Sequence, residues 1–160
     1  MSEAPVVLKA DVFWCSNYVK SQQSDKYQVD LCNLSAQAVQ ALAMIGIEAK
    51  RDDVKKPAQG YYITCKSRDY CIVTVDKDDK PLGEYVKTEN GTEVKRDEQG
   101  KPLYTKIANG SKAIATITPY NTLVKGKKFT QGSIKKLVIT DLIEYVPAGI
   151  DMNKLEEEAL

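Results

Sequence analysis

The sequence contains no histidine among its 160 residues. This absence removes the commonest general base and every Ser–His or Cys–His nucleophile pair. Neither a Gly-x-x-x-x-Gly-Lys phosphate loop nor a Gly-x-Gly-x-x-Gly dinucleotide fingerprint occurs. Catalysis by lysine, tyrosine or a carboxylate stays open, although no motif points to it. We therefore expect a binding protein that needs no cofactor, and not an enzyme.

The four cysteines lack the Cys-x-x-Cys spacing that marks many zinc and redox sites. Without histidine, a zinc ion would need all four thiolates at irregular spacing. Disulfides are rare in a reducing cytoplasm, so we expect small buried hydrophobic side chains and no metal site. The residues concerned are Cys15, Cys32, Cys65 and Cys71.

Long apolar runs are missing as well. No stretch approaches the roughly 20 residues of a membrane-spanning helix. The first five residues lack the basic start and apolar stretch of a signal peptide. We expect a cytoplasmic location and no membrane contact.

The charge is nearly balanced, with a formal net charge of +1. Residues 151–160 carry a net charge of −3, which leaves +4 on residues 1–150. A mildly basic body with a short acidic tail suits a protein that binds polyanions, and it also suits an ordinary globular domain.

Six segments are predicted to be β-strands, because apolar residues alternate or β-branched residues are enriched. Residues 67–69 predict a tight link that joins two of these strands as a hairpin, and residues 122–132 predict a Lys- and Gly-rich loop between the last two. The predicted strands are residues 6–14, 26–31, 61–66, 70–75, 111–120 and 133–145.

One helix is predicted after Ser35, which suits a helix N-cap. Its apolar stripe is more typical of a core-facing surface than of a partner-binding one, and Gly46 is a natural stop. The stripe consists of Ala38, Val39, Leu42 and Ile45.

Residues 77–104 are polar and read as an insertion. The pattern Asp-x-x-x-Lys-Pro-Leu begins at Asp76 and recurs at Asp97, with Asn90-Gly91 between the two copies. Asn-Gly is a strong signal for a tight hairpin turn, so we predict a protruding hairpin near residues 84–95. Short strands with a single helix fit a small, partly open barrel.

Proteins that bind single strands need cations for the phosphates and aromatic faces for the bases. Three groups combine the two, although each also fits an ordinary solvated surface. The groups are Lys112 with Tyr120; Tyr62, Lys66, Arg68 and Tyr70; and Lys125, Lys127, Lys128 and Phe129 on the predicted loop.

Trp14 is a further candidate. Strand alternation puts it on the core face with Val12, whereas its place at the strand end beside Ser16 and Asn17 favours an exposed stacking platform. We keep both readings.

Short motifs in a fixed order resemble the single-stranded DNA-binding proteins of lytic tailed bacteriophages, most closely those of short-tailed phages and their cyanophage relatives. The resemblance covers most of the chain. The final Leu-Ile-Glu-Tyr-Val motif lies in residues 109–146, the segment that resembles the family most strongly. The motifs lie at residues 26–31, 50–52, 60–64, 75–76, 80–82, 107–112, 118–120 and 142–146.

The resemblance implies a mainly β, α+β fold, namely a five-stranded oligonucleotide-binding barrel (OB-fold) over residues 1–150 with one helix and an inserted hairpin. It implies sequence-independent coating of single-stranded DNA in phage replication and recombination, in the cytoplasm of the infected host. It also implies dimerisation and work with the phage polymerase and helicase-primase. Tyr120 matches the family's Pro-Tyr stacking position, and Lys112 its Gly-Ser-Lys position.

Two features depart from the family's pattern: the 151–160 tail is short, and the 83–96 hairpin is long. Two other kinds of barrel remain as alternatives, a protein-interaction or assembly barrel and an RNA-binding one.

Overall fold

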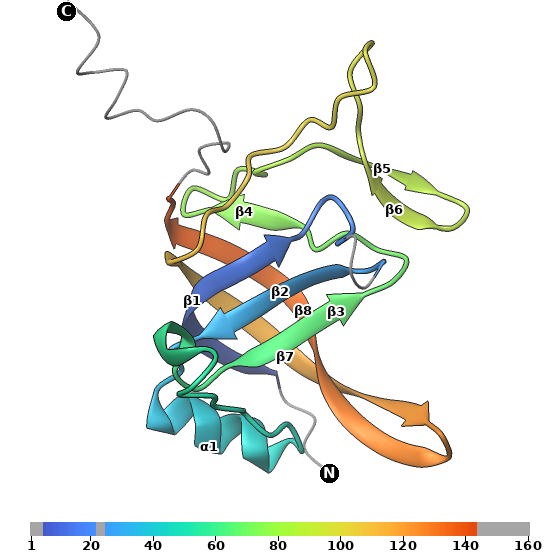
Figure 1. Cartoon of the computed structure of the whole chain (residues 1–160). Helices are drawn as coiled ribbons and strands as arrows, with labels where there is room; N and C mark the ends of the chain where they lie inside the picture. Colours follow the sequence, from blue (N-terminus) through green and yellow to red (C-terminus); the bar gives the residue numbers. More distant parts are fainter. Residues whose placement is uncertain (1–4, 22–24, 144–160) are drawn as a thin grey trace, which may run out of the picture.

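The computed structural model describes residues 5–21 and 25–143, and it has a single curled sheet at its centre (Figure 1). The sheet has six strands in the order β3-β2-β1-β7-β8-β4. The strands of this sheet are β1 Val6–Ser16, β2 Tyr27–Cys32, β3 Ile63–Ser67, β4 Thr74–Asp76, β7 Ser111–Val124 and β8 Lys127–Asp141. The remaining elements are α1 Ala36–Met44, the 3-10 turn η1 Pro57–Gln59, and the two-stranded β5 Tyr85–Thr88 and β6 Gly91–Val94.

The interior of the curled sheet is the core. On β7 the small side chains of Ala113 and Ala115 alternate inward with Ile117, and all three are buried. Small residues let the sheet bend tightly, as a narrow barrel requires. The curl is not closed by backbone pairing, since β3 and β8 flank a cavity of about 260 Å³ that Cys65 lines.

The predicted helix is confirmed. The Ser35 hydroxyl caps it by accepting a hydrogen bond from the Ala38 backbone N–H at 3.1 Å. Ala38 and Leu42 are buried against the barrel. Gly46 follows the last turn with φ +88°, which glycine adopts without strain.

The predicted hairpin between residues 61–66 and 70–75 is wrong. Residues 63–67 do form a strand, β3, but it pairs with β2. Of residues 70–75 only the last two lie in a strand, β4, which pairs in parallel with β8, with Val75 beside Val138. The intervening backbone is held elsewhere: the Cys71 N–H donates to the Thr92 carbonyl, and the Ile72 N–H donates to the Asn17 carbonyl. These distant partners override the local turn signal.

The pairing of β4 also explains why residues 137–139 are apolar on both faces. Leu137 and Ile139 are buried in the core, while Val138 lies between β7 and β4 on the outer face. Two register shifts against β7 show that β8 is bulged in this region, which disturbs the alternation.

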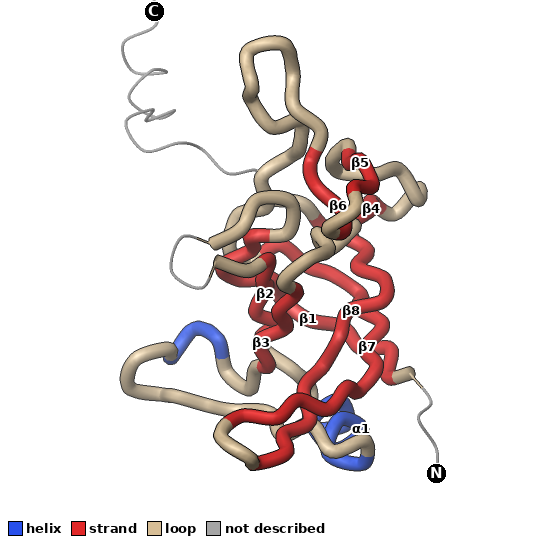
Figure 2. The backbone as a smooth tube through the Cα atoms, turned by 90° about the vertical axis from the view of Figure 1, so that its right-hand side faces the viewer, coloured by secondary structure: helices blue, strands red, loops and turns tan. Residues whose placement is uncertain are grey.

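The polar insertion contains the predicted hairpin, formed by β5 and β6. Figure 2 places this hairpin at the end of the molecule opposite α1. The two Asp-x-x-x-Lys copies fold into the same turn. In each, the aspartate carboxylate accepts backbone hydrogen bonds from the second and fourth following residues, at 2.8 and 3.0 Å for Asp76 and at 2.9 and 2.8 Å for Asp97.

Replacing Gly91 by alanine tests how firmly the insertion is fastened. At φ +134° a new Cβ would overlap the backbone carbonyl oxygen of Asp69, whereas a Cβ on Gly100, at φ +82°, would meet open space. We expect Gly91→Ala to lower the free energy of unfolding by more than about 2 kcal/mol and Gly100→Ala by about 1 kcal/mol. Urea denaturation measures both, and equal losses would show that the Asp69 contact is unimportant.

Candidate nucleic-acid interface

A large open groove crosses the outward face of β1, β2 and β3, with a volume of about 1450 Å³. The turn η1 and its preceding loop form one wall, and the segment 104–109 contributes to the rest. Five lysines line the groove, namely Lys20, Lys55, Lys56, Lys66 and Lys106. Among the described residues that line the groove, the only carboxylate is that of Asp30, which is buried. The groove therefore presents a cationic surface.

Trp14 stands in this groove with 57% of its surface exposed. The reading that placed it in the core with Val12 is wrong, because β1 is irregular between Phe13 and Ser16 and Trp14 has φ +51°. Its backbone N–H donates to the Asn109 side-chain oxygen at 2.9 Å. The bulge breaks the alternation of the strand and turns the indole outward.

The indole edge of Trp14 is held by a chain of polar side chains, of which Gln59 and Asp30 are buried. Its Nε1–H donates to Gln59 Oε1 at 3.1 Å. Gln59 Nε2 donates to Asp30 Oδ2 at 3.0 Å, and the Thr64 hydroxyl donates to Asp30 Oδ1 at 2.7 Å. This chain fixes the ring at its edge and leaves its face available for stacking.

The groove contains Lys66 from the second predicted group but does not expose Tyr62. Tyr62 is 9% exposed and lies under Lys56, whose Nζ is 4.8 Å from the ring centroid. Arg68 and Tyr70 are exposed beyond the end of β3, and Tyr70 lines the small cavity together with Lys66.

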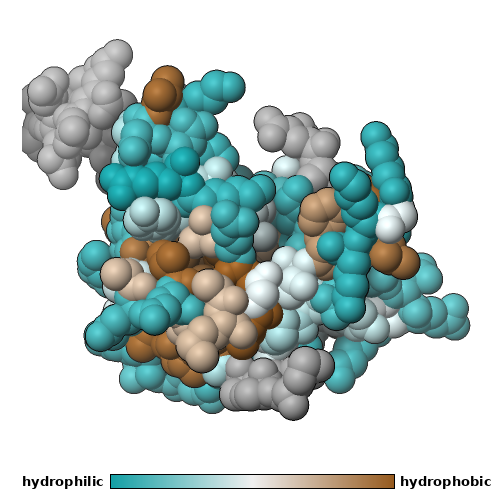
Figure 3. Space-filling model, turned by 90° about the horizontal axis from the view of Figure 1, so that it is seen from below, coloured by the Kyte–Doolittle hydropathy of each residue, from teal (hydrophilic) through white to brown (hydrophobic). Residues whose placement is uncertain are grey.

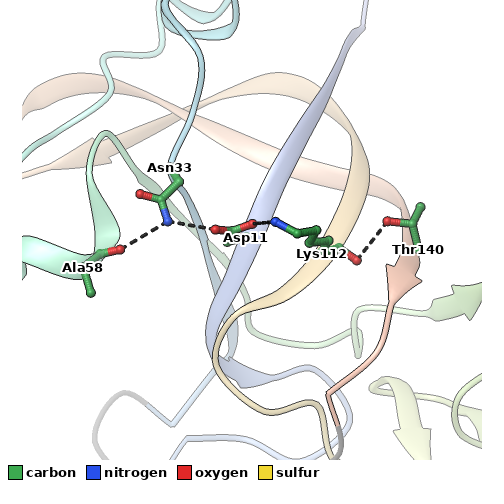
Figure 4. Close-up of polar contacts among 5 residues, drawn as sticks. All are labelled: Asp11, Asn33, Ala58, Lys112 and Thr140. Carbon is green, nitrogen blue, oxygen red and sulfur yellow. Dashed lines mark hydrogen bonds and ion pairs between the residues drawn. The ribbon is translucent and has the colours of Figure 1, made fainter.

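Lys112 lies on β7, next to β1 in the sheet, and is already paired (Figure 4). Its Nζ is 3.4 Å from Asp11 Oδ1, while Asn33 Nδ2 donates to Asp11 Oδ2 at 2.8 Å and to the Ala58 carbonyl oxygen at 3.2 Å. Asp11 thus links β7 to the wall that carries Gln59. A phosphate would have to compete with this carboxylate for Lys112.

The predicted loop at residues 122–132 is wrong: β7 and β8 continue as a paired ribbon to a two-residue turn. Lys125 and Gly126 form this turn with φ +50° and +78°, the left-handed values that a tight hairpin needs. The ribbon projects beside α1, and in the view from below apolar and hydrophilic residues mix on it (Figures 1 and 3). Lys127 and Lys128 are exposed there, and Phe129 is 47% exposed.

Tyr120 lies at the base of this ribbon and is half-buried. Its hydroxyl donates to Gln131 Oε1 on the paired strand at 2.7 Å, and burial raises the pKa of the phenol. The structure therefore separates two groups of candidates. The groove group is Trp14 and Lys66, and the ribbon group is Tyr120, Lys127, Lys128 and Phe129. Lys112 belongs to neither, because it is paired with Asp11.

The charge pattern of the later chain is a sequence signal that none of the short motifs contains. Residues 99–140 contain eight lysines and no acidic residue. This stretch supplies the 104–109 segment of the groove, the two long strands β7 and β8, and the ribbon tip. Counting charge over windows would have found it.

The cysteines do not form a reactive or metal-binding site in the described residues. All four are free thiols, and burial raises the pKa of Cys15, Cys32 and Cys65 to about 12 and that of Cys71 to about 11. Over residues 5–21 and 25–143 no group of three or more acidic or cysteine side chains could hold a metal ion. No helix in the same residues is long and apolar enough to cross a membrane.

No family model matches the chain, and neither does any curated protein sequence. Solved structures do match. A C-terminally truncated single-stranded DNA-binding protein from bacteriophage Enc34 has a TM-score of 0.55 at 10% identity, covering 91% of this chain and 95% of the other. The same phage protein in complex with single-stranded DNA has a TM-score of 0.55 at 12% identity, covering 93% and 96%.

The single-stranded DNA-binding protein gp2.5 of bacteriophage T7 matches less well, with a TM-score of 0.48 at 12% identity over 98% of this chain and 96% of the other. At such identities the Enc34 matches establish the fold. The protein has the OB-fold, and its sheet gains a sixth short strand, β4, from the parallel pairing with β8. The solved structures are of the kind of phage protein that the sequence motifs resemble.

Substitutions of Trp14 and Phe129 would show which of the two groups carries stacking. If the groove holds the bases, Trp14→Ala weakens binding of a dT oligonucleotide by about 1–3 kcal/mol, or roughly 5- to 150-fold. We expect a smaller effect from Phe129→Ala, because Phe129 lies on a ribbon outside the groove. Fluorescence anisotropy of a labelled oligonucleotide measures both, and a larger loss for Phe129→Ala would assign stacking to the ribbon.

Proposed function

We propose that this protein binds single-stranded DNA without sequence preference and coats it during phage DNA replication or recombination. The observation that carries the proposal is the groove, in which one exposed and edge-held tryptophan is surrounded by lysines. Phosphates would lie along the lysines, and bases would stack on Trp14. Binding would occur without chemical turnover.

The comparisons support this function from a second direction. The Enc34 structures have the same fold, and one of them holds single-stranded DNA. The motifs in the sequence resemble proteins of the same kind. A protein-interaction barrel would share the fold but would not require a cationic groove around an exposed indole. An RNA-binding barrel would use the same kind of groove, so comparing DNA with RNA in a titration separates these two functions.

The remaining parts of the proposal rest on the resemblance. They are the cytoplasm of an infected bacterium as the location, dimerisation, and work with a phage polymerase and helicase-primase. The acidic tail at residues 151–160, where polymerase docking would be sought, lies outside the described residues. Size-exclusion chromatography with light scattering tests the dimer directly.

Trp14 is the only tryptophan, so its fluorescence reports on the groove alone. We expect poly-dT to quench it, with weaker responses to duplex DNA and RNA. Affinity should fall with salt at a log–log slope of about −0.7 for each phosphate neutralised. No binding of any strand tighter than about 100 micromolar at about 50 mM salt would refute the proposed function, because even non-specific binding is normally as tight.

The groove lysines should set this salt dependence. Replacing Lys55 and Lys66 by methionine removes two cations and should make the slope shallower by about 1.4, because each contributes about 0.7. The control is the same double change at Lys77 and Lys87, which are exposed and lie outside the groove. An equal change in slope for both pairs would mean that phosphates do not follow the groove.

A further inference from the structure

We propose that Gln59 is a positioning residue that holds the Trp14 indole ready for a base before any strand arrives. This inference rests on the proposed function, because it concerns the same groove. Gln59 comes from η1, far in sequence from β1, and is 3% exposed. Because this buried carboxamide accepts a hydrogen bond from the edge of an exposed ring, it restricts the orientation of that ring.

The chemistry of its partners fixes which way the amide points. An indole N–H only donates and a carboxylate only accepts, so the Gln59 oxygen must face Trp14 and its NH₂ group must face Asp30. The distances agree, at 3.1 Å to Trp14 Nε1 and 3.0 Å to Asp30 Oδ2. The NH₂ group also lies 3.1 Å from the Cys32 sulfur. The amide therefore has one hydrogen-bonded orientation.

The backbone of Trp14 needs this support. A tryptophan at φ +51° is in a region that residues other than glycine adopt at a cost. The Asn109 side chain accepts from the backbone N–H, and Gln59 accepts from the ring N–H, so the residue is held at both ends. Holding an aromatic side chain before binding reduces the entropy lost when a base stacks on it.

The first test measures the free protein. Time-resolved fluorescence anisotropy of Trp14 should show a restrained ring in the wild type and faster local motion in Gln59→Met, which keeps the side-chain length but loses the hydrogen bonds. Gln37→Met on the exposed surface of α1 is the control and should change nothing. Equal ring mobility in wild type and Gln59→Met would overturn the proposal.

The second test uses binding of a dT oligonucleotide. Gln59→Met should weaken it roughly 3- to 10-fold, the entropy of re-ordering one large side chain. In a Trp14→Phe background, which keeps an aromatic face but has no N–H, the same change should add almost nothing. A loss of equal size in both backgrounds would mean that Gln59 acts only on the stability of the wall, and would overturn the positioning role.

The third test needs no substitution, which protects the inference if Gln59→Met folds poorly. The single indole N–H signal in the wild-type NMR spectrum should exchange with water at least about tenfold more slowly than a free indole, because it is hydrogen-bonded to a buried group. Fast exchange would overturn the proposal even if the protein binds DNA. Slow exchange in a protein that binds no strand would refute the proposed function and leave the positioning of Trp14 standing.

Discussion

The groove depends on one buried carboxylate, that of Asp30. It is 4% exposed, and a carboxylate can be kept there only if donors replace its water. Thr64 on β3 and Gln59 on η1 are those donors. Gln59 also accepts a hydrogen bond from the indole N–H of Trp14 on β1. One charge in the floor of the groove thus fixes three separate parts of the chain relative to one another.

A second carboxylate, that of Asp11 on β1, makes a related set of connections. It joins Lys112 on β7 to Asn33 after β2, and Asn33 in turn donates to the Ala58 carbonyl of η1. The turn η1 is therefore held by hydrogen bonds from two directions, although it has only three residues. A wall this short could not keep Gln59 in place through its own backbone bonds.

The sequence predicts the elements of this fold better than their partners. Alternation places β1 and β2 correctly, helix capping places α1, and the Asn-Gly turn signal places the β5–β6 hairpin, because all three signals are local. The parallel pairing of Thr74–Asp76 with β8 is set by distant backbone groups, so the local turn at 67–69 misleads. For the candidate site, Lys66 could be predicted by strand alternation, whereas the exposure of Trp14 could not. It depends on a bulge stabilised by Asn109 and Gln59, which lie 95 and 45 residues away.

The insertion at residues 77–104 also acts on the groove, although its hairpin projects from the opposite end to α1. The two ends of the insertion are hydrogen-bonded to each other: the Glu84 backbone N–H donates to the Leu103 carbonyl, and the Thr105 backbone N–H donates to the Leu82 carbonyl. The chain therefore leaves the insertion at a fixed point and enters the groove with Tyr104 and Lys106. Tyr104 is braced by the buried Tyr18, whose ring lies 6.1 Å away. The polar insertion therefore fixes where the segment that lines one side of the groove begins.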